Sequence, residues 1–341
     1  MSGTGPLLIP AAARHSLRVM FIAKHAKWEG GLHGEDGNHA VYHAEMRETL
    51  RGLGLNLVVE DRYEVLFDRP DVDFVFPLLN RGGFLNSEML LPLLCTKHGI
   101  PYLGASPIVR GLADDKHLSK MTAVARGVPT LPWAIYRRGA PIDQDQCPAG
   151  DRLVIKPNAS SASWGVGDAY DWTAARTQIA RIQAEGHDAI VEPFLNGDDV
   201  EVCVITINGE PVILPLMLNQ QTDPTLLRTY NEKRDLVDRG DKYRLIPFVD
   251  PHWQSLVTDM TKEMIKEFQP FDYGRFEFRL DQETGQLHFM EVNLSCNLWS
   301  QKTISRAAGL AGFSHTELIE TILCEAFRRC GLIELDAARA A

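Results

Sequence analysis

Apolar and polar residues alternate along two segments near the C-terminal end of the chain, residues 271–280 and 287–297. Successive side chains of a strand point to opposite faces, so each segment would have one apolar face and one charged face. The polar residues 281–285 between them end in glycine, which is typical of a hairpin connection. The pattern therefore predicts two antiparallel strands that each turn one face toward a core.

The charged faces of these two strands carry the first candidate chemistry. Glu277 lies on the first strand with Arg275 and Arg279, and Glu291 and Asn293 lie on the second. Antiparallel pairing would gather the two carboxylates and the amide. Hard oxygen ligands suit Mg²⁺, especially when nucleotide phosphates complete its coordination. Ordinary charges on an exposed strand face are the competing interpretation, because any single E-x-N pattern is common.

Strand and helix patterns alternate over the first third of the chain. Apolar runs predict strands at 17–23, 55–59, 72–79 and 101–103. Helical periodicity predicts a helix that follows Asn38 and stops at Gly52 or Gly54, and another at 89–98. We expect Asn38 to cap the first helix and Gly99 to end the second. This alternation is typical of a doubly wound α/β unit, in which loops at the strand ends face a ligand crevice. Here those loops are 24–38 and 80–86.

The rest of the chain mixes helices with strands in no regular alternation. The predicted elements are helices at 114–126, 173–185, 253–268 and 314–329, strands at 153–157 and 189–195, and a hairpin of 197–207 with 211–217 around Asn208-Gly209. Residues 219–243 are charged and lack apolar periodicity. A loop of that length in a compact domain is usually functional, so we predict a lid.

Composition narrows the classes of function. The chain has 341 residues, a hydrophobic content of 45% and a formal net charge of −10 at pH 7. An acidic chain without a basic stripe is not expected to bind nucleic acid, and no apolar run is long enough to span a membrane. The six cysteines include no C-x-x-C pair. We therefore expect neither structural zinc nor disulfides, and a cytoplasmic location.

Several polar residues follow predicted strands. Lys156 ends an apolar strand before the serine-containing loop 158–167, where backbone N–H groups and a lysine could hold phosphate, although no Walker motif is present. Lys116 opens a helix, and an ordinary surface salt bridge is its simpler interpretation. Glu192 precedes residues 193–195, a stretch that could offer backbone groups and an apolar slot to a purine, or could be a linker.

Histidines suggest a second, weaker possibility. His39 and His43 have the i, i+4 spacing of two metal ligands on a helix, and the preceding loop adds His25 and His33. No carboxylate is fixed beside them by position, so we favour a polar helix face over a zinc site. The chain has no G-x-S-x-G nucleophile motif and no G-x-G-x-x-G after a strand. Covalent hydrolases and dinucleotide-dependent dehydrogenases therefore lack support.

Taken together, these segments resemble the ATP-grasp superfamily, and within it the D-alanine–D-alanine ligases. The resemblance covers nearly the whole chain in order, with blocks at 74–83 (FVFPLLNRGG), 99–120, 154–167, 191–197, 230–233, 274–277 and 291–293 and a late helix from Arg306. One such block carries little weight, whereas seven or eight in the same order make a strong case. The resemblance implies an α/β (α+β ATP-grasp) fold. Its expected parts are a doubly wound unit at 1–112 and two α+β subdomains that clamp ATP, 113–194 and 195–335, with a lid at 219–243.

The resemblance also implies roles for individual residues. ATP is expected to bind Lys116, Lys156, Ser161, Ser163, Glu192, Phe194, Leu195, Lys233 and either Asp199 or Glu201. Two Mg²⁺ ions, or alternatively Mn²⁺, are expected on Glu277, Glu291 and Asn293. The expected catalytic residues are Lys233, which reaches the γ-phosphate, and Arg275, which stabilises the charge of an acyl phosphate and of a tetrahedral intermediate.

Four departures from the family pattern fall on the amino-acid pockets. Asn80 replaces a histidine, the sequence at 160–165 replaces a glycine-rich loop, Arg234 stands where a tyrosine usually follows closely, and no Pro-Gly follows residues 291–293. We therefore expect an ATP-dependent carboxylate–amine ligase that forms an amide through an acyl phosphate on a substrate other than D-alanine. A true D-alanine–D-alanine ligase and a non-catalytic nucleotide-binding regulator are the alternatives.

Loop position gives candidates for the two small-molecule substrates. The carboxylate substrate is expected at Lys24, Glu35, Asn80, Arg81 or Arg234, and the carboxylate of the amine substrate at Ser300 or Lys302. Ligases of this pattern are often homodimers, so a second copy of the chain is the one protein partner that the resemblance suggests.

Overall fold

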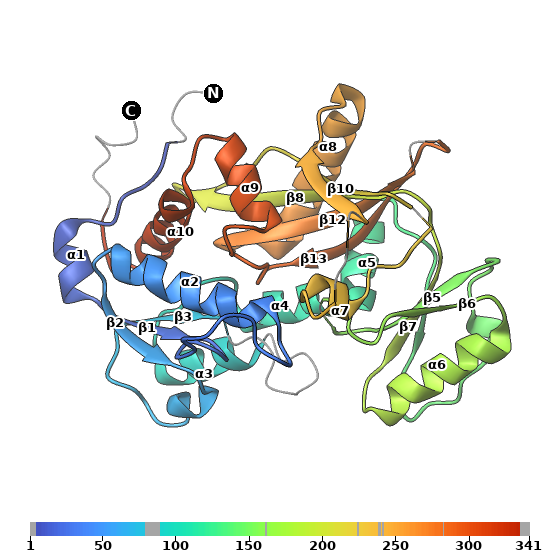
Figure 1. Ribbon diagram of the computed structural model, residues 1–341, viewed down its shortest axis with the longest axis horizontal. Coiled ribbons are helices and arrows are strands. Elements are labelled where there is room, and N and C mark those ends of the chain that lie inside the picture. Colours follow the sequence, from blue (N-terminus) through green and yellow to red (C-terminus); the bar gives the residue numbers. More distant parts are fainter. Residues whose placement is uncertain are drawn as a thin grey trace.

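Three sheets form the framework of the protein: a parallel sheet of three strands and two further sheets of four and six strands, whose pairs are antiparallel. The computed structural model describes residues 5–78, 89–160, 162–223, 225–237, 240, 242–281 and 283–334. Figure 1 shows the N-terminal sheet and the four-stranded sheet side by side below the six-stranded sheet. The predicted α/β class of fold is confirmed. Within these ranges, no helix is long and apolar enough to cross a membrane.

The N-terminal sheet has helices on both faces, as a doubly wound unit requires. Its strand order is β2 (Asn56–Glu60), β1 (Arg18–Ile22), β3 (Phe74–Pro77). On β1, Val19 and Phe21 pack in the same core as helix α2 (Asn38–Gly52). Met20 and Ile22 face the other way and pack with α3 (Leu90–His98). Successive residues of β1 point to opposite faces of the sheet, and because both sets are apolar the strand contributes to both cores.

Two details of this unit differ from the prediction. The N-cap of α2 is Gly37, not Asn38, because Asn38 is already helical and its side chain donates a hydrogen bond from Nδ2 to Asp235 Oδ2 at 2.7 Å. The predicted strand at 101–103 is reduced to one parallel bridge between Tyr102 and Val75. The chain turns away at Gly104, whose N–H donates to the Asp272 carboxylate at 2.6 Å.

The four-stranded sheet carries the loop predicted to hold phosphate. Its strand order is β4 (Ala134–Tyr136), β7 (Ala189–Pro193), β5 (Leu153–Pro157), β6 (Gly167–Ala169), and α6 (Trp172–Ala184) packs on it. The prediction of β5 is confirmed with the same bounds. The strands β4 and β6 have three residues each, too few for a period-two pattern to be visible in the sequence.

The six-stranded sheet contains the hairpin and the alternating strands that the sequence predicted. Its order is β11 (Tyr243–Pro247), β10 (Met217–Gln221), β8 (Asp198–Ile207), β12 (Tyr273–Asp281), β13 (Gln286–Asn293), with β9 (Glu210–Ile213) also paired to β8. The hairpin at 208–209 is confirmed. The predicted strand at 211–217 is interrupted after Ile213, and pairing resumes at Met217 beyond Pro215, which has no N–H to donate to a ladder.

The two faces of this sheet are covered to different extents. Helix α8 (Pro251–Phe268) packs against the face that carries Phe276 and Phe278. On the other face, α9 (Thr303–Leu310) and α10 (His315–Arg329) share a core with Cys203 and Ile205 at one end of β8. The other end of that face carries Asp199, which is paired in register with Arg279. Helices α4 (Pro107–Asp114) and α5 (Lys116–Ala125) lie beside β13.

Candidate active site

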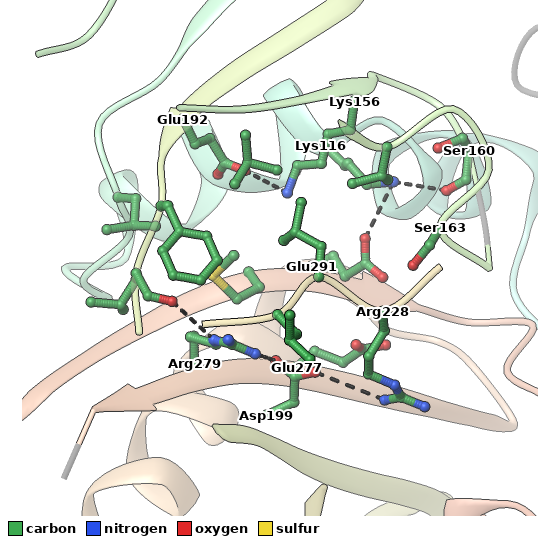
Figure 2. Close-up of a pocket in the computed structure, with 18 of the residues that line it drawn as sticks. Lys116, Lys156, Ser160, Ser163, Glu192, Asp199, Arg228, Glu277, Arg279 and Glu291 are labelled. Atoms are coloured by element: carbon green, nitrogen blue, oxygen red, sulfur yellow. Dashed lines mark hydrogen bonds and ion pairs between the residues drawn. The ribbon is translucent and has the colours of Figure 1, made fainter. Parts of the chain in front are cut away.

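A cavity that is partly open to solvent lies between the four-stranded sheet and the uncovered end of the six-stranded sheet, and together with the open space at its mouth it measures about 920 Å³. Figure 2 shows lysines and serines of the upper wall facing the acids and Arg279 of the strand floor, with Arg228 beside them. The sequence-predicted residues that line it are Lys116, Lys156, Ser163, Glu192, Phe194, Leu195, Asp199, Lys233, Glu277 and Glu291. Ser161 lies outside the described residues.

Glu192 is buried at the back of this cavity between two lysines. Its carboxylate forms ion pairs with Lys156 on β5 and with Lys120 on α5, and Glu192 and Lys120 are 1% and 0% exposed. Burial alone would raise the pKa of Glu192, but the two lysines lower it to about 2. Because the Glu192 carboxylate is paired with both lysines, the backbone groups of residues 192–195 are what is left to bind a purine base. Sequence reasoning missed Lys120, although it lies one turn after Lys116 on a predicted helix.

Lys116 connects the serine-containing loop to the strand floor. It is the first residue of α5, where the Asp115 side chain caps the helix by accepting from the N–H of Leu118. Its Nζ donates to the carbonyl of Ser160 at 2.8 Å and lies 3.2 Å from Glu291 Oε2. Ser163 follows in the same loop with a left-handed φ of 60°. Lys116, which was predicted to bind phosphate, therefore links the serine-containing loop to the strand floor.

The floor of the cavity holds a pair of carboxylates directly opposite each other on neighbouring strands. Glu277 on β12 pairs in register with Glu291 on β13, and the register shifts by one residue just beyond, where Phe278 pairs with Phe289. Met290 is the extra residue of this bulge, and its side chain lines the cavity. The shift lets Phe289 face the core while Glu291 faces the cavity.

The two acids differ in their affinity for a proton. Burial raises the pKa of Glu277 to about 7, with Glu291 and Glu201 adding to the effect against the pull of Arg275, which donates from Nε at 3.0 Å. Burial would also raise the pKa of Glu291, but Lys116, Lys156 and Lys233 lower it to about 2. The carboxyl group of Glu277 is therefore the one that gains most from a nearby cation.

These residues fit a divalent cation. Two carboxylates face each other at the floor, and Asn293, paired in register with Arg275, is the next residue of β13 on the same face. Its Oδ1 accepts from the N–H of Ser295 at 2.9 Å, and it does not belong to the cavity lining described above. A hard cation on these oxygens would displace the proton that burial places on Glu277.

Asp199 and Glu201, the two candidates for the ribose, are separated by the structure. Asp199 lines the cavity and accepts from Arg279 Nη1 at 2.8 Å. Glu201 lies behind it, where it accepts from Asn219 at 3.2 Å and from Thr303. Glu201 also lies 3.5 Å from Arg275 Nη1. Its position supports Arg275, and the cavity itself contains Asp199.

The segment predicted to be a lid, residues 219–243, carries Lys233 into the cavity. The short helix α7 (Tyr230–Lys233) begins with a capping box between Thr229 and Glu232. Burial and the charge of Arg228 lower the pKa of Lys233, and Glu277 and Glu291 oppose this. The next residue, Arg234, accepts at its carbonyl from the backbone N–H of Asn38 at 3.0 Å. The lid is therefore fastened to the start of α2 in this structure, as Figure 1 shows by the position of α7.

Comparison with known proteins gives this arrangement a family. Residues 125–324, more than half of the chain, match the family described as D-ala D-ala ligase C-terminus. The chain belongs to the D-alanine–D-alanine ligase family. An uncharacterized Sinorhizobium fredii protein, y4sG, is 30% identical over 244 residues, 70% of each chain. The D-alanine–D-alanine ligase of a Marinomonas strain is 23% identical over 83% of this chain and 89% of its own.

Solved structures agree with the fold of this ligase-family chain. The D-alanine–D-alanine ligase of Bacillus anthracis complexed with ATP superposes with a TM-score of 0.71 at 17% identity, covering 93% of this chain and 99% of the other. A Vibrio cholerae D-alanyl-alanine synthetase A gives 0.71 at 16% identity, covering 91% and 98%. At these identities the likeness establishes the ATP-grasp fold and leaves the substrate open.

The described residues that were predicted to bind the two substrates do not line the cavity of this ligase-family chain. Lys24 is exposed and ion-paired with Asp36, and Glu35 is exposed. Ser300 donates from Oγ to Glu45 at 2.9 Å, and Lys302 lies 5.6 Å from the Trp299 ring centre. Asn80 and Arg81 fall outside the described residues. Sequence reasoning missed Arg228, which lines the cavity from the lid and for which no motif gave a signal.

The expected polar face at His39 and His43 is wrong for the second histidine. His43 is 1% exposed, and its ring contacts those of Tyr42, His39 and His25, with centroids 5.2, 4.9 and 5.8 Å away. His25, His33 and Asp36 offer possible ligand atoms within 4.8 Å of one another. The Asp36 carboxylate, however, is bonded to His25 at 2.7 Å and ion-paired with Lys24, so it already has two partners.

Proposed function

We propose that this protein is an ATP- and Mg²⁺-dependent ligase that joins a carboxylate to an amine through an acyl phosphate, on a substrate other than D-alanine. One observation supports the proposal most directly. Lys116, Lys156 and Lys233, which come from three separate elements, converge in one cavity on the carboxylate pair of Glu277 and Glu291. A positively charged wall above an acidic floor suits metal-bound nucleotide phosphates better than either charge would alone.

The residues of the cavity divide the proposed chemistry among them. Lys116 and Lys156 hold phosphates, and Lys233 reaches the transferred phosphoryl group from the lid. Mg²⁺, when held by Glu277, Glu291 and Asn293, supplies neutralisation of phosphate charge. A carboxylate oxygen of the acid attacks the γ-phosphorus and ADP leaves. The amine then attacks the acyl carbon and phosphate leaves, with Arg275 stabilising the oxyanion.

The position of Arg275 and the closure of the lid support these two steps. Arg275 is fixed by Glu277 and Glu201, so its guanidinium does not need to reorganise as charge develops. The fastening of Arg234 and Asp235 to Asn38 holds the lid over the cavity, and a closed site protects an acyl phosphate from water. We assign the three sheets to functional units at 1–112, 113–194 and 195–335, and place the reaction in the cytoplasm.

The products of turnover test the reaction. We expect ADP and phosphate to appear only when ATP, a carboxylate and an amine are all present, with a product mass equal to the sum of the substrates minus water. AMP and pyrophosphate would rule out the acyl-phosphate route. Glu291→Gln should lower kcat by about 100-fold or more because it removes a metal charge. Glu263→Gln, on the exposed face of α8, should leave kcat unchanged.

D-alanine–D-alanine ligation is the second candidate, because the curated relatives of known activity carry that name. Supplying D-alanine as the sole amino acid with ATP decides between the two. Efficient formation of the dipeptide would show that the altered loops do not exclude D-alanine. Tight ATP binding without ADP release across a broad panel of acids and amines would instead favour a nucleotide-binding regulator.

A further inference from the structure

His43 presents a buried hydrogen-bond donor that lacks an acceptor. Its Nδ1 accepts from the backbone N–H of His25 at 3.2 Å. Burial, followed by the charges of His25 and Arg234, lowers the pKa of His43 to about 3, so the ring is neutral at pH 7. A neutral imidazole has one protonated nitrogen, and with Nδ1 accepting, the proton is on Nε2. Nε2 is buried and has no hydrogen-bond partner in the part of the chain that the structure describes.

The charges around this donor are mainly positive. Arg234 on the lid acts on both His39 and His43, and Lys302 acts on His39. Asp36 is the one acid among the leading influences on either ring, and its carboxylate is already paired with Lys24 and His25. A buried N–H among cations favours an anion, because both the unmet hydrogen bond and the charge are then satisfied.

We propose that the α2–lid face formed by His39, His43 and Arg234 binds a second carboxylate of the acid substrate, so that the substrate is a dicarboxylate. This inference rests on the proposed ligase function. Arg234 directly follows Lys233, which lines the cavity, so the proposed anion site adjoins that cavity along the chain. An ammonium group in place of this carboxylate would be disfavoured, because it would face the N–H donor of His43 and the positive charges of Arg234 and Lys302.

The lid must move for such a substrate to enter. Nε2 is buried in the same structure in which the Arg234 carbonyl accepts from the backbone N–H of Asn38, so we place anion binding in this closed state. The dicarboxylate would enter the open site and supply the missing acceptor as the lid closes. Arg234 would then act both in fastening the lid through its backbone and in binding the anion through its guanidinium.

Binding of matched acids tests the assignment without requiring turnover. Calorimetric titration of the full chain with Mg²⁺ and ADP would compare succinate with butyrate and β-alanine, which replace one carboxylate by a methyl group and by an ammonium-bearing end. We expect succinate to bind at least about 10-fold more tightly than either, the loss that follows from leaving one charged hydrogen bond unmade. Equal binding, or tighter binding of β-alanine, would overturn the proposal.

Two variants separate recognition from folding. His43→Phe keeps an aromatic ring of similar position but removes Nε2–H together with the Nδ1 that accepts from the His25 N–H. Arg234→Met removes the charge. Each variant should reduce the preference for succinate over butyrate to less than about 3-fold. Tyr42→Phe, which loses only the contact of its hydroxyl with the Leu298 N–H at 3.1 Å, is the control and should keep the preference. A preference retained in both test variants would refute the site.

The outcomes also separate this inference from the ligase proposal. Amide formation with ammonium-bearing monocarboxylic acids, at rates no lower than with dicarboxylates, would support the ligase and overturn the dicarboxylate assignment. Selective succinate binding with no ADP release for any acid and amine would support the anion site and contradict the ligase function.

Discussion

Replacing Gly37 by alanine should disable the lid while leaving most of the protein intact. Gly37 has φ 54° and ψ −126°, a backbone conformation that glycine alone adopts readily. A Cβ added there would lie 1.9 Å from the carbonyl oxygen of Arg234 and 3.3 Å from Leu236 Cδ2. Because real contacts of this kind exceed about 3 Å, the lid must retreat by about 1 Å or more.

The expected magnitude follows from what the lid carries. A displacement of about 1 Å at a positioned group costs about 100-fold in rate, so kcat of Gly37→Ala should fall by about that factor as Lys233 leaves the phosphate. The strained φ should cost about 1–3 kcal/mol of stability. Asn38→Ala keeps the backbone bond to Arg234 and loses the side-chain bond to Asp235, so its kcat should fall by about 10-fold.

Gly54→Ala is the matched control for this prediction. Gly54 follows the other end of α2, has φ 73° and has no other heavy atom within 4 Å of an added Cβ. It should lose a similar amount of stability, about 1–2 kcal/mol, and retain full kcat. The assays are ADP release at saturating substrates and urea unfolding. Normal turnover in Gly37→Ala, or an equal loss in both variants, would refute the coupling of Gly37 to the lid.

Three further predictions concern the buried charges. Because the pKa of Glu277 is about 7, binding of Mg²⁺ and ADP at pH 7 should release about half a proton from this group. Titration calorimetry in buffers of different ionisation enthalpy measures the release, and Glu277→Gln should remove it. A wild-type protein that releases no proton would contradict the metal assignment. Since its folded pKa is raised, unliganded protein should lose stability as pH rises from about 4.5 to 7, seen as a falling urea midpoint that is absent in Glu277→Gln. Glu192→Gln should cost about 3–5 kcal/mol in urea unfolding, because two buried lysines lose their counter-charge, whereas Glu263→Gln in an exposed pair should change stability by less than about 0.5 kcal/mol. A small loss for Glu192→Gln would mean that water reaches Lys120 and Lys156.

Local pattern was sufficient for the parts of the site that one element supplies. The run LVIKP predicted β5 and put Lys156 at its end, and alternation predicted β12 with Glu277 on its charged face. The sequence pattern did not show which residues of other elements a side chain contacts. The burial of His43 depends on the loop of His25 and on a lid almost two hundred positions later in the chain, so its i, i+4 spacing from His39 looked like a polar face.

Ion pairs between elements were hidden for the same reason. Glu192 was expected among the residues that bind ATP, because the residues near it in the sequence give no sign of the two lysines with which its carboxylate is paired. Elements of three or four residues, such as β4, β6 and α7, were missed because they are shorter than the periods that reveal strands and helices.

The extra residue in β13 adds a side chain to the cavity without altering which face the acids occupy. Leu287 and Phe289 are buried on one side of Met290, and Val292 and Leu294 on the other, so the buried positions change from odd to even at the bulge. Deleting Met290 would restore unbroken alternation, with Phe289 and Val292 still in the core and Glu291 and Asn293 still on the cavity face. A variant one residue shorter would thus keep its acid pair and lose only the side chain of Met290 from the wall of the cavity.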